Sequence, residues 1–258
     1  MRDGLLTGWA VSMTALLLAT GPGQAAELSL QQAVQAPSRS APYVARDPVR
    51  HPAGELGFFG VTPHATVIEI WPGGGYWTQI LAPYLHDHGT YELATDVPGS
   101  APEGHGFALS AKLKGMLAAT PDVYGNVRFI EFGKLHPDLA KPNSADVVLT
   151  FRNLHNWMRD GDAPALLAGI RRALKPGGVL GIEDHRGNTR TPQDPAAGSG
   201  YVRQDYAIAL VEKAGFKLVG SSEMDANPRD TADWPKGCLL YTSPSPRDRT
   251  RSRMPSSA

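Results

Sequence analysis

The residues best suited to bind a ligand surround a run of three glycines. Residues 67–70 (Val-Ile-Glu-Ile) are typical of a buried parallel strand, and residues 72–75 (Pro-Gly-Gly-Gly) end that strand abruptly. Apolar residues then recur at helical spacing from Trp77 to Leu85. Glycine has no Cβ, so a ligand can approach this backbone closely, and the free amides of the following helix favour electron-rich atoms. The segment predicts a ligand-binding loop between a strand and a helix.

Two acidic residues indicate which ligand this loop binds. Glu69 precedes the glycines, and Asp96 ends an expected second strand, Tyr91–Thr95, where a carboxylate can accept hydrogen bonds from two ribose hydroxyls. A carboxylate at Glu69 would repel a pyrophosphate but would suit ammonium and hydroxyl groups. Thr78 also stands where a dinucleotide-binding loop has its last glycine. The pattern favours a positively charged nucleoside, and an NAD-linked enzyme is the weaker alternative.

At this point the chain resembles the class I methyltransferases that use S-adenosylmethionine. Their pattern of an acidic residue followed by glycines at alternate positions matches Glu69, Gly73 and Gly75, with Trp71 in place of the first glycine. Further matches are the fourth strand (145–151), a helix, Pro-Gly-Gly turn and fifth strand (171–181), and a helix end and sixth strand (213–219). The resemblance spans about Arg46 to Gly237 and narrows to a group of exported bacterial predicted methyltransferases. It implies an α/β fold, a Rossmann-like sheet with helices on both faces, and S-adenosylmethionine as cofactor.

In open α/β sheets, ligands bind outside the carboxyl ends of the strands. The residues expected there to bind the cofactor are Glu69, Trp71, Gly73, Gly74, Gly75, Tyr76, Asp96, Phe151 and Arg152. The candidate catalytic residues are His155, His185, Asn153 and Asn156. An imidazole titrates near neutrality and can act as a base, while the asparagines would orient the methyl acceptor.

Each of these residues also has a purely structural interpretation. His155 and Asn156 would then only tie a loop together, and His185 would form an ion pair with its acidic neighbours. No metal site is expected, because His86 and His88 have the spacing of a metal-binding pair but no third ligand nearby, and helix-end capping explains them better.

The segment before the first strand contains Arg46, Arg50 and His51 and then an apolar cluster. In the resembling group this segment is a lid helix. Two interpretations stay open for these three side chains: contact with a substrate, or a solvated helix entry.

The two ends of the chain are expected to lie outside the fold. Residues 1–25 have an early Arg2, an apolar core and small residues before Ala26, which is the pattern of a cleaved secretory signal. The apolar run is too short for a stable membrane anchor. We therefore expect a periplasmic or secreted protein, with a linker at 26–45 and one domain at 46–237.

Residues 238–258 resemble the translation of sequencing-library adapter DNA, and we interpret them as a non-native, disordered tail. The single cysteine lies there, so the remaining chain has no disulfide and no cysteine nucleophile. Four of the 25 basic and one of the 25 acidic residues also lie there, which leaves 21 basic against 24 acidic residues and no basic excess to indicate nucleic acid. The family's seventh strand would follow Gly237, so we expect it to be missing through truncation, leaving an exposed sheet edge and a chain prone to aggregate.

These observations favour an exported enzyme that methylates a small-molecule substrate. The alternative is a non-catalytic periplasmic protein that binds a nucleoside or small metabolite in the same cleft. The supply of S-adenosylmethionine outside the cytoplasm speaks for the alternative, whereas the residues after the fourth and fifth strands speak for catalysis.

Overall fold

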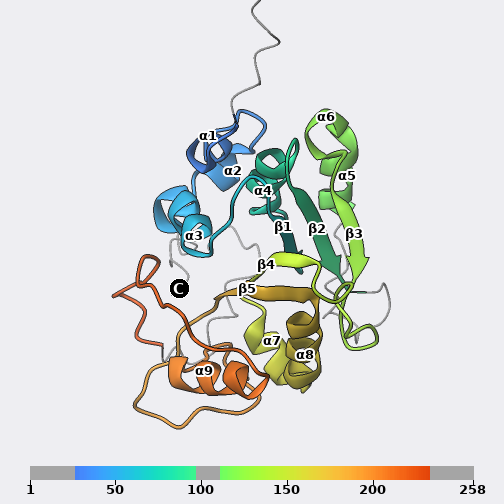
Figure 1. Ribbon diagram of the computed structural model, residues 1–258. Helices are drawn as coiled ribbons and strands as arrows, with labels where there is room; N and C mark the ends of the chain where they lie inside the picture. The colour runs from blue at the N-terminus through green and yellow to red at the C-terminus, as the bar shows by residue number, and fades with distance from the viewer. Residues whose placement is uncertain (1–26, 97–110, 233–258) are drawn as a thin grey trace, which may run out of the picture.

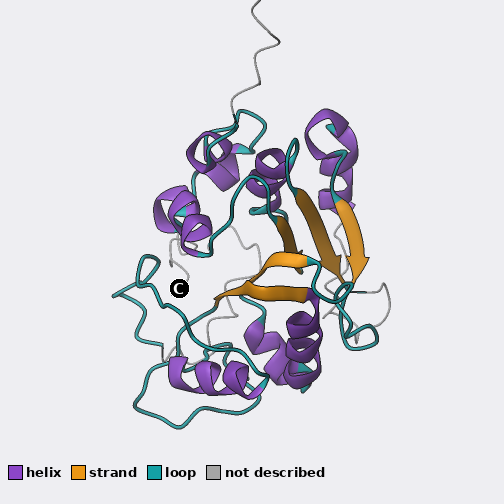
Figure 2. Ribbon diagram, viewed as in Figure 1, coloured by secondary structure: helices purple, strands orange, loops and turns teal. Residues whose placement is uncertain are grey.

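The computed structural model describes residues 27–96 and 111–232. Their centre is a parallel sheet with the strand order β3-β2-β1-β4-β5 (Figures 1 and 2). The strands are β1 (Thr66–Ile70), β2 (Thr90–Thr95), β3 (Arg128–Glu131), β4 (Ala145–Phe151) and β5 (Leu174–Glu183). This order changes direction between β1 and β4, as in doubly wound folds. The predicted Rossmann-like fold is confirmed.

Helices cover both faces of the sheet (Figure 1). One face carries α1 (Leu30–Val34), α2 (Ala41–Val44), the 3-10 helix η1 (Asp47–Val49), α3 (Pro52–Phe58), α4 (Thr78–Leu85), α5 (Ala111–Ala119) and α6 (Pro121–Tyr124). The other carries α7 (Leu154–Asp160), α8 (Ala163–Ala173) and α9 (Gln204–Lys213). Side chains alternate between the faces along a strand, and β1, β2 and β4 each contribute to two cores, one on either side of the sheet.

The pairing of the strands places mainly apolar residues side by side. Val67 lies beside Tyr91 and Val147 in the core under α4, whereas the neighbouring Ile68 lies beside Val148 in the core over α8. All except Tyr91 are apolar and β-branched, which suits a strand that is buried on both faces. The sheet therefore holds the carboxyl ends of β1 and β4 next to each other.

The predicted linker, residues 26–45, is wrong over its described part. Ser29 caps α1, and its hydroxyl and the side chain of Gln32 exchange hydrogen bonds with each other's backbone N–H groups. Ala33 and Val34 are buried in the core under α4. The segment is thus part of the domain and packs against it.

The predicted sixth strand is also wrong. Helix α9 ends at Lys213 as expected, but residues 216–222 run without strand pairing. Among the described residues no further strand pairs with the outer edge of β5. Residues 216–222 therefore have no intervening strand with which to form hydrogen bonds. The predicted Pro-Gly-Gly turn is an irregularity inside β5, where Gly177 has a φ of 80° and the pairing with β4 shifts.

The expected signal peptide, the adapter-like tail and the place of the seventh strand lie outside the described residues. Within those residues, no helix combines the length and apolar character needed to cross a membrane.

Candidate functional site

The loop after β1 has the backbone that its glycine pattern predicts. Trp71, Gly73 and Gly75 have φ values of 51°, 58° and 87°, so every second residue is left-handed. Alternation of this kind turns successive backbone N–H groups toward one point, where they can meet an electron-rich atom. Trp71 occupies a left-handed position that favours glycine, which explains why the resembling family has glycine there.

Side chains from two other segments lie against this loop. The hydroxyl of Tyr43, in α2, donates to the carbonyl of Gly74 at 2.5 Å. A Cβ on Gly75 would lie 2.6 Å from Leu113 of α5. A side chain at Gly74 would therefore require Tyr43 to shift, and one at Gly75 would require Leu113 to shift.

Trp71 is held by the protein rather than exposed to a ligand. Its indole N–H donates to the carbonyl of Phe132 at 3.0 Å, and its ring meets Trp157 edge-on at 5.9 Å. Two of the other predicted aromatic residues frame the loop: Tyr76 follows the last glycine, and Phe151 stacks on Trp77 at 4.2 Å between ring centres. These rings fix the walls of the loop.

Glu69 lies in a different environment from the predicted one. Its carboxyl accepts hydrogen bonds from Thr78, at 3.2 Å, and from the hydroxyl of Tyr91, and the residue is only 1% exposed. Burial raises the pKa of Glu69 to about 7, against the opposing effect of its two hydrogen bonds. This arrangement does not favour direct contact of Glu69 with a ligand, and it places the carboxyl beneath α4.

Asp96 follows β2 directly, at the edge of the sheet where the loops meet. A Cβ on Gly133, after β3, would lie 2.4 Å from the Asp96 carboxylate. Glu69 and Asp96 therefore have different neighbours, and their joint recognition of one ligand stays a prediction.

The residues after β4 converge on the carboxyl end of β1. Arg152 is left-handed, with a φ of 61°, and its guanidinium lies 3.9 Å from Glu183. The amide of Asn153 donates to the carbonyl of Ile70 at 3.1 Å and so ties the two loops together. Asn156 donates more weakly to the carbonyl of Arg152, at 3.4 Å. Asn156 thus makes the kind of local contact that the structural interpretation described, and Asn153, which that interpretation did not include, ties the two loops together.

The two candidate histidines lie side by side, with ring centres 5.8 Å apart. Asp184 accepts the backbone N–H of His155 at 3.0 Å and contacts its Nδ1 at 2.7 Å. The ion-pair interpretation assigned the acidic neighbours to His185, but the structure gives Asp184 to the ring of His155. Burial would raise the pKa of Asp184, yet His155 outweighs it and leaves that pKa below the ordinary value.

His185 is the histidine with an unpartnered ring atom. Its Nδ1 is buried and has no hydrogen-bond partner. Burial lowers the pKa of His185 to about 4, with Asp184 opposing and Arg152 adding to the shift. The imidazole is therefore neutral at pH 7, as a general base must be, but a pKa this low makes it a weak proton acceptor.

Three arginines of the N-terminal segment gather around Tyr76. The guanidinium carbons of Arg39, Arg46 and Arg50 lie 5.4, 5.5 and 4.8 Å from the ring centre of Tyr76. Asp47 accepts from Arg39 at 2.6 Å and from the Tyr76 hydroxyl at 2.7 Å. Arg50 is only 3% exposed, so a solvated helix entry is wrong for this residue. The signal available in the sequence was three arginines within twelve residues ahead of a buried strand.

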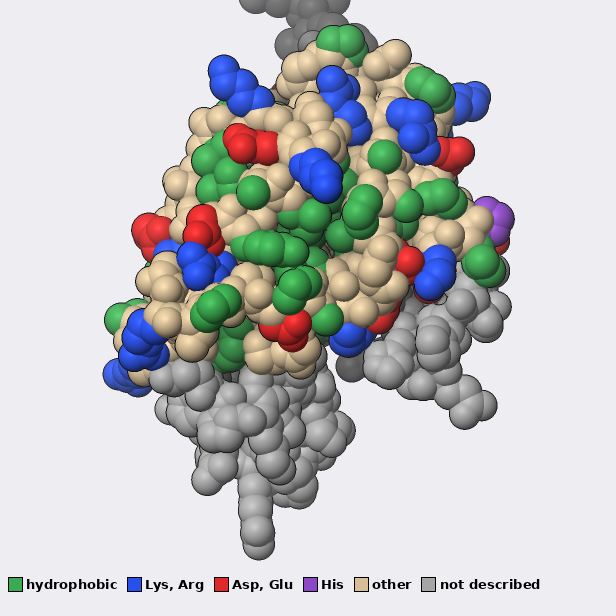
Figure 3. Space-filling model, turned by 90° about the horizontal axis from the view of Figure 1, so that it is seen from below, with side chains coloured by type: hydrophobic (Ala, Val, Ile, Leu, Met, Phe, Trp, Pro, Cys, Tyr) green, Lys and Arg blue, Asp and Glu red, His purple; other side chains and the backbone are tan. Residues whose placement is uncertain are grey.

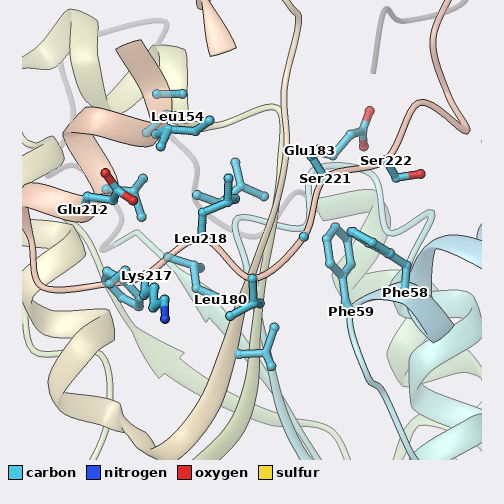
Figure 4. Close-up of a pocket in the computed structure, with 18 of the residues that line it drawn as sticks. Phe58, Phe59, Leu154, Leu180, Glu183, Glu212, Lys217, Leu218, Ser221 and Ser222 are labelled. Carbon is cyan, nitrogen blue, oxygen red and sulfur yellow. The ribbon is translucent and has the colours of Figure 1, made fainter. Parts of the chain in front are cut away.

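A cavity of about 640 Å³ lies along the outer edge of β5, away from the glycine loop. Phe58 and Phe59 face Leu180 and Leu218 across it (Figure 4). Hydrophobic side chains also gather among charged ones on the lower face of the molecule (Figure 3). The carboxylate of Glu183 lies at the polar end of this cavity. No sequence motif indicated it.

No protein-family model matches the chain, and no curated protein sequence does. Solved structures with a similar arrangement include a SAM-dependent methyltransferase from Aquifex aeolicus, at 15% identity and a TM-score of 0.49, covering 67% of this chain and 83% of that one. A SAM-dependent methyltransferase from Leishmania major has 17% identity and a TM-score of 0.49, covering 78% and 77%. An O-methyltransferase family protein from Burkholderia thailandensis has 20% identity and a TM-score of 0.48, covering 76% and 60%. The fold assignment itself rests on the strand order described above.

Proposed function

We propose that the chain transfers a methyl group from S-adenosylmethionine to a small-molecule acceptor. The observation that carries this proposal is the loop after β1, where residues 71, 73 and 75 are all left-handed. The loop stands where the strand order reverses, which is where α/β sheets bind nucleotides. Asp96, after the neighbouring strand, is placed to accept the ribose hydroxyls.

The cofactor would supply an activated methyl group on a sulfonium, and the chain would supply position and proton transfer. Methyl transfer depends on holding the acceptor atom and the methyl carbon in line. Asn153 fixes the loop after β4 to the end of β1, and Asp184 fixes the ring of His155. The neutral His185 is the group able to take a proton from the acceptor.

Calorimetry tests the proposal directly. The full chain is titrated with S-adenosylmethionine, S-adenosylhomocysteine, NAD and adenosine, in the wild type, in Asp96→Asn and in Asp138→Asn. We expect both sulfur nucleosides to bind, with at least tenfold weaker binding in Asp96→Asn, because a carboxylate is the stronger acceptor of hydroxyl hydrogen bonds. Asp138 is a matched control with an exposed side chain. Binding of adenosine without either sulfur nucleoside would instead identify a non-catalytic binding protein.

We also propose that the protein is exported with cleavage near Ala25. The support is the sequence pattern of residues 1–25. Expression in a Gram-negative host, followed by fractionation and mass spectrometry of the N-terminus, tests it. A cytoplasmic product that retains Met1 would contradict export without bearing on the methyl transfer.

A further inference from the structure

Several buried polar atoms between α3, β4 and β5 have no hydrogen-bond partner. They are Nη1 and Nη2 of Arg50, Oε2 of Glu55, Oε2 of Glu183 and Nδ1 of His185. Arg50, Glu55 and Glu183 are 3%, 4% and 6% exposed. Buried polar groups in folded proteins are nearly always paired, and an unpaired buried guanidinium is especially costly. Because several such atoms lie in one region, they indicate a binding site for a polar ligand.

These atoms belong to one electrostatic cluster. The pKa of Arg50 falls to about 10, chiefly through burial and then through Arg152, while Glu183 opposes the shift. The pKa of Glu55 rises to about 10 through burial and then through Glu183 and Asp225. Glu55 is therefore a neutral carboxylic acid at pH 7. The groups influence one another because they face the same region, at the carboxyl ends of β4 and β5.

Two of the carboxylates nearby already have other partners. Asp47 is bound by Arg39 and Tyr76, and Asp225 lies 2.7 Å from His51. Within the described part of the chain, neither Arg46 nor Arg50 forms a salt bridge to a carboxylate. Both guanidinium groups lie over the ring of Tyr76, directly after the glycine loop. Positive charge is therefore present at the site, and among the described residues no carboxylate is in direct contact with either guanidinium.

We propose that Arg50, assisted by Arg46, binds the carboxylate of the methyl acceptor, and that this acceptor is a small monocarboxylic acid carrying a hydrogen-bond donor. This inference rests on the proposed function. A guanidinium binds a carboxylate through two parallel hydrogen bonds, which would satisfy both free nitrogens of Arg50. A monoanion suits the site better than a phosphate dianion, because Glu183 and Asp225 flank it. The unpartnered oxygen of Glu183 accepts the donor group of the ligand.

The cofactor carries a carboxylate too. The position along the sheet distinguishes a site for the cofactor's carboxylate from a site for the acceptor's. The glycine loop and Asp96 follow β1 and β2, whereas Glu183 ends β5 on the other side of the reversal in strand order. Arg50 adjoins the β5 side through its neighbour His51, which lies 2.7 Å from Asp225, and Glu55, Glu183 and Asp225 all line the cavity along β5. It is therefore assigned to the acceptor.

Binding measurements on the full chain test the assignment. The probes are glycolate and 4-hydroxybenzoate, each compared with its amide, glycolamide or 4-hydroxybenzamide, by ligand-observed NMR. The variants are Arg50→Gln, Arg50→Lys and, as a control for charge alone, Arg128→Gln at an exposed position of β3. Thermal melts by circular dichroism establish that each variant is folded, and Arg50→Lys retains the buried charge if Arg50→Gln does not fold.

We expect at least one acid to bind the wild type and Arg128→Gln, at least tenfold more tightly than its amide. Arg50→Gln should lose at least tenfold in affinity for that acid, and Arg50→Lys should lose less, because it keeps the charge but not the planar fork. Equal binding of acid and amide, or no acid binding at all, would overturn the inference.

Titration with S-adenosylhomocysteine and 5′-methylthioadenosine, which lacks the carboxylate, separates the two sources and the two proposals. If Arg50→Gln weakens S-adenosylhomocysteine alone, Arg50 binds the cofactor and the acceptor assignment is wrong. If neither nucleoside binds any variant while the acids still bind, the methyltransferase proposal fails and the anion site stands. If the nucleosides bind and no acid does, the methyltransferase proposal stands and the inference of an anion site fails.

Discussion

Asp184 holds His155 by two of its atoms at once. One carboxylate oxygen accepts the backbone N–H at 3.0 Å, and the other contacts the ring Nδ1 at 2.7 Å. Both residues are buried, with side chains 3% and 8% exposed. Because the carboxylate accepts a hydrogen bond from Nδ1–H, a neutral His155 carries its proton on Nδ1 and none on Nε2. The pair fixes α7 to the end of β5 and sets the tautomer of the ring beside His185.

The substitution Asp184→Asn should therefore destabilise the protein by about 2–3 kcal/mol, since a charge-assisted pair is lost in a buried place. The free energy of unfolding in urea at pH 7 measures it. Asp160→Asn is the control, because Asp160 bonds Arg159 at 3.1 Å on the surface and should change stability by less than about 0.5 kcal/mol. Equal effects of the two substitutions would refute the structural role of the buried pair.

Substitution of glycine by alanine should destabilise the protein in the loop after β1 and stabilise it in α5. Gly73 has a φ of 58° with open space around it, so alanine there adds only backbone strain of about 1 kcal/mol. At Gly75 the new methyl would also meet Leu113 at 2.6 Å, and the loss should be larger. Gly115 lies in α5 with nothing nearby, and alanine there should stabilise by about 0.5–1 kcal/mol. Urea unfolding gives all three, and a stabilising Gly73→Ala would contradict the left-handed loop.

The strands and the glycine loop could be predicted because local pattern determines them. The fourth strand, residues 145–151, was predicted with its observed bounds, since its apolar run is continuous and buried on both faces. The three glycines likewise predicted a loop between β1 and α4, and the structure adds that Trp71, Gly73 and Gly75 are left-handed in it. These features depend on residues close together in the sequence.

The remaining features depend on partners far apart in the chain. Whether residues 216–219 form a strand depends on a neighbour at the edge of β5, which their own apolar content does not report. The pairing of Asp184 with His155 crosses 29 positions. The burial of Arg50 follows from the packing of α2 and α3 over the glycine loop. Spacing within the sequence carries no signal for such contacts.

Glu69 makes stability depend on pH in one direction. Its carboxyl has a pKa of about 7 in the fold against an ordinary value of 4.5. Between these values the unfolded chain ionises and the folded one keeps its proton, so stability is lost as pH rises from about 4.5 to 7, by on the order of 3 kcal/mol. Glu69→Gln abolishes this contribution. The unfolding free energy of Glu69→Gln minus that of the wild type should therefore become more positive between pH 5 and 8. A constant difference would mean that Glu69 is ionised in the fold.

The outer edge of β5, with which no strand of the described residues pairs, should promote self-association. Val219 and Leu218, next to this edge in the cavity lining, are 85% and 49% exposed. Val219→Lys should raise the fraction of monomer at high concentration, as measured by sedimentation velocity. Leu135 is 63% exposed outside that cavity lining, and Leu135→Lys is the matched control. If both lysines act equally, general charge rather than the β5 edge is responsible.

His185 makes stability depend on pH in the opposite direction from Glu69. Its pKa is about 4 in the fold against an ordinary 6.5, because burial disfavours the imidazolium. Its contribution is present above pH 6.5 and is lost as pH falls toward 4, since the unfolded chain then binds a proton that the folded chain refuses. The loss amounts to on the order of 3 kcal/mol.

In the wild type this effect and that of Glu69 oppose each other between pH 4.5 and 6.5, so only the difference between variant and wild type isolates either one. His185→Gln should gain stability relative to the wild type on going from pH 7 to pH 4.5. A parallel pH profile for His185→Gln and the wild type would mean that burial does not lower the pKa of His185 in the fold.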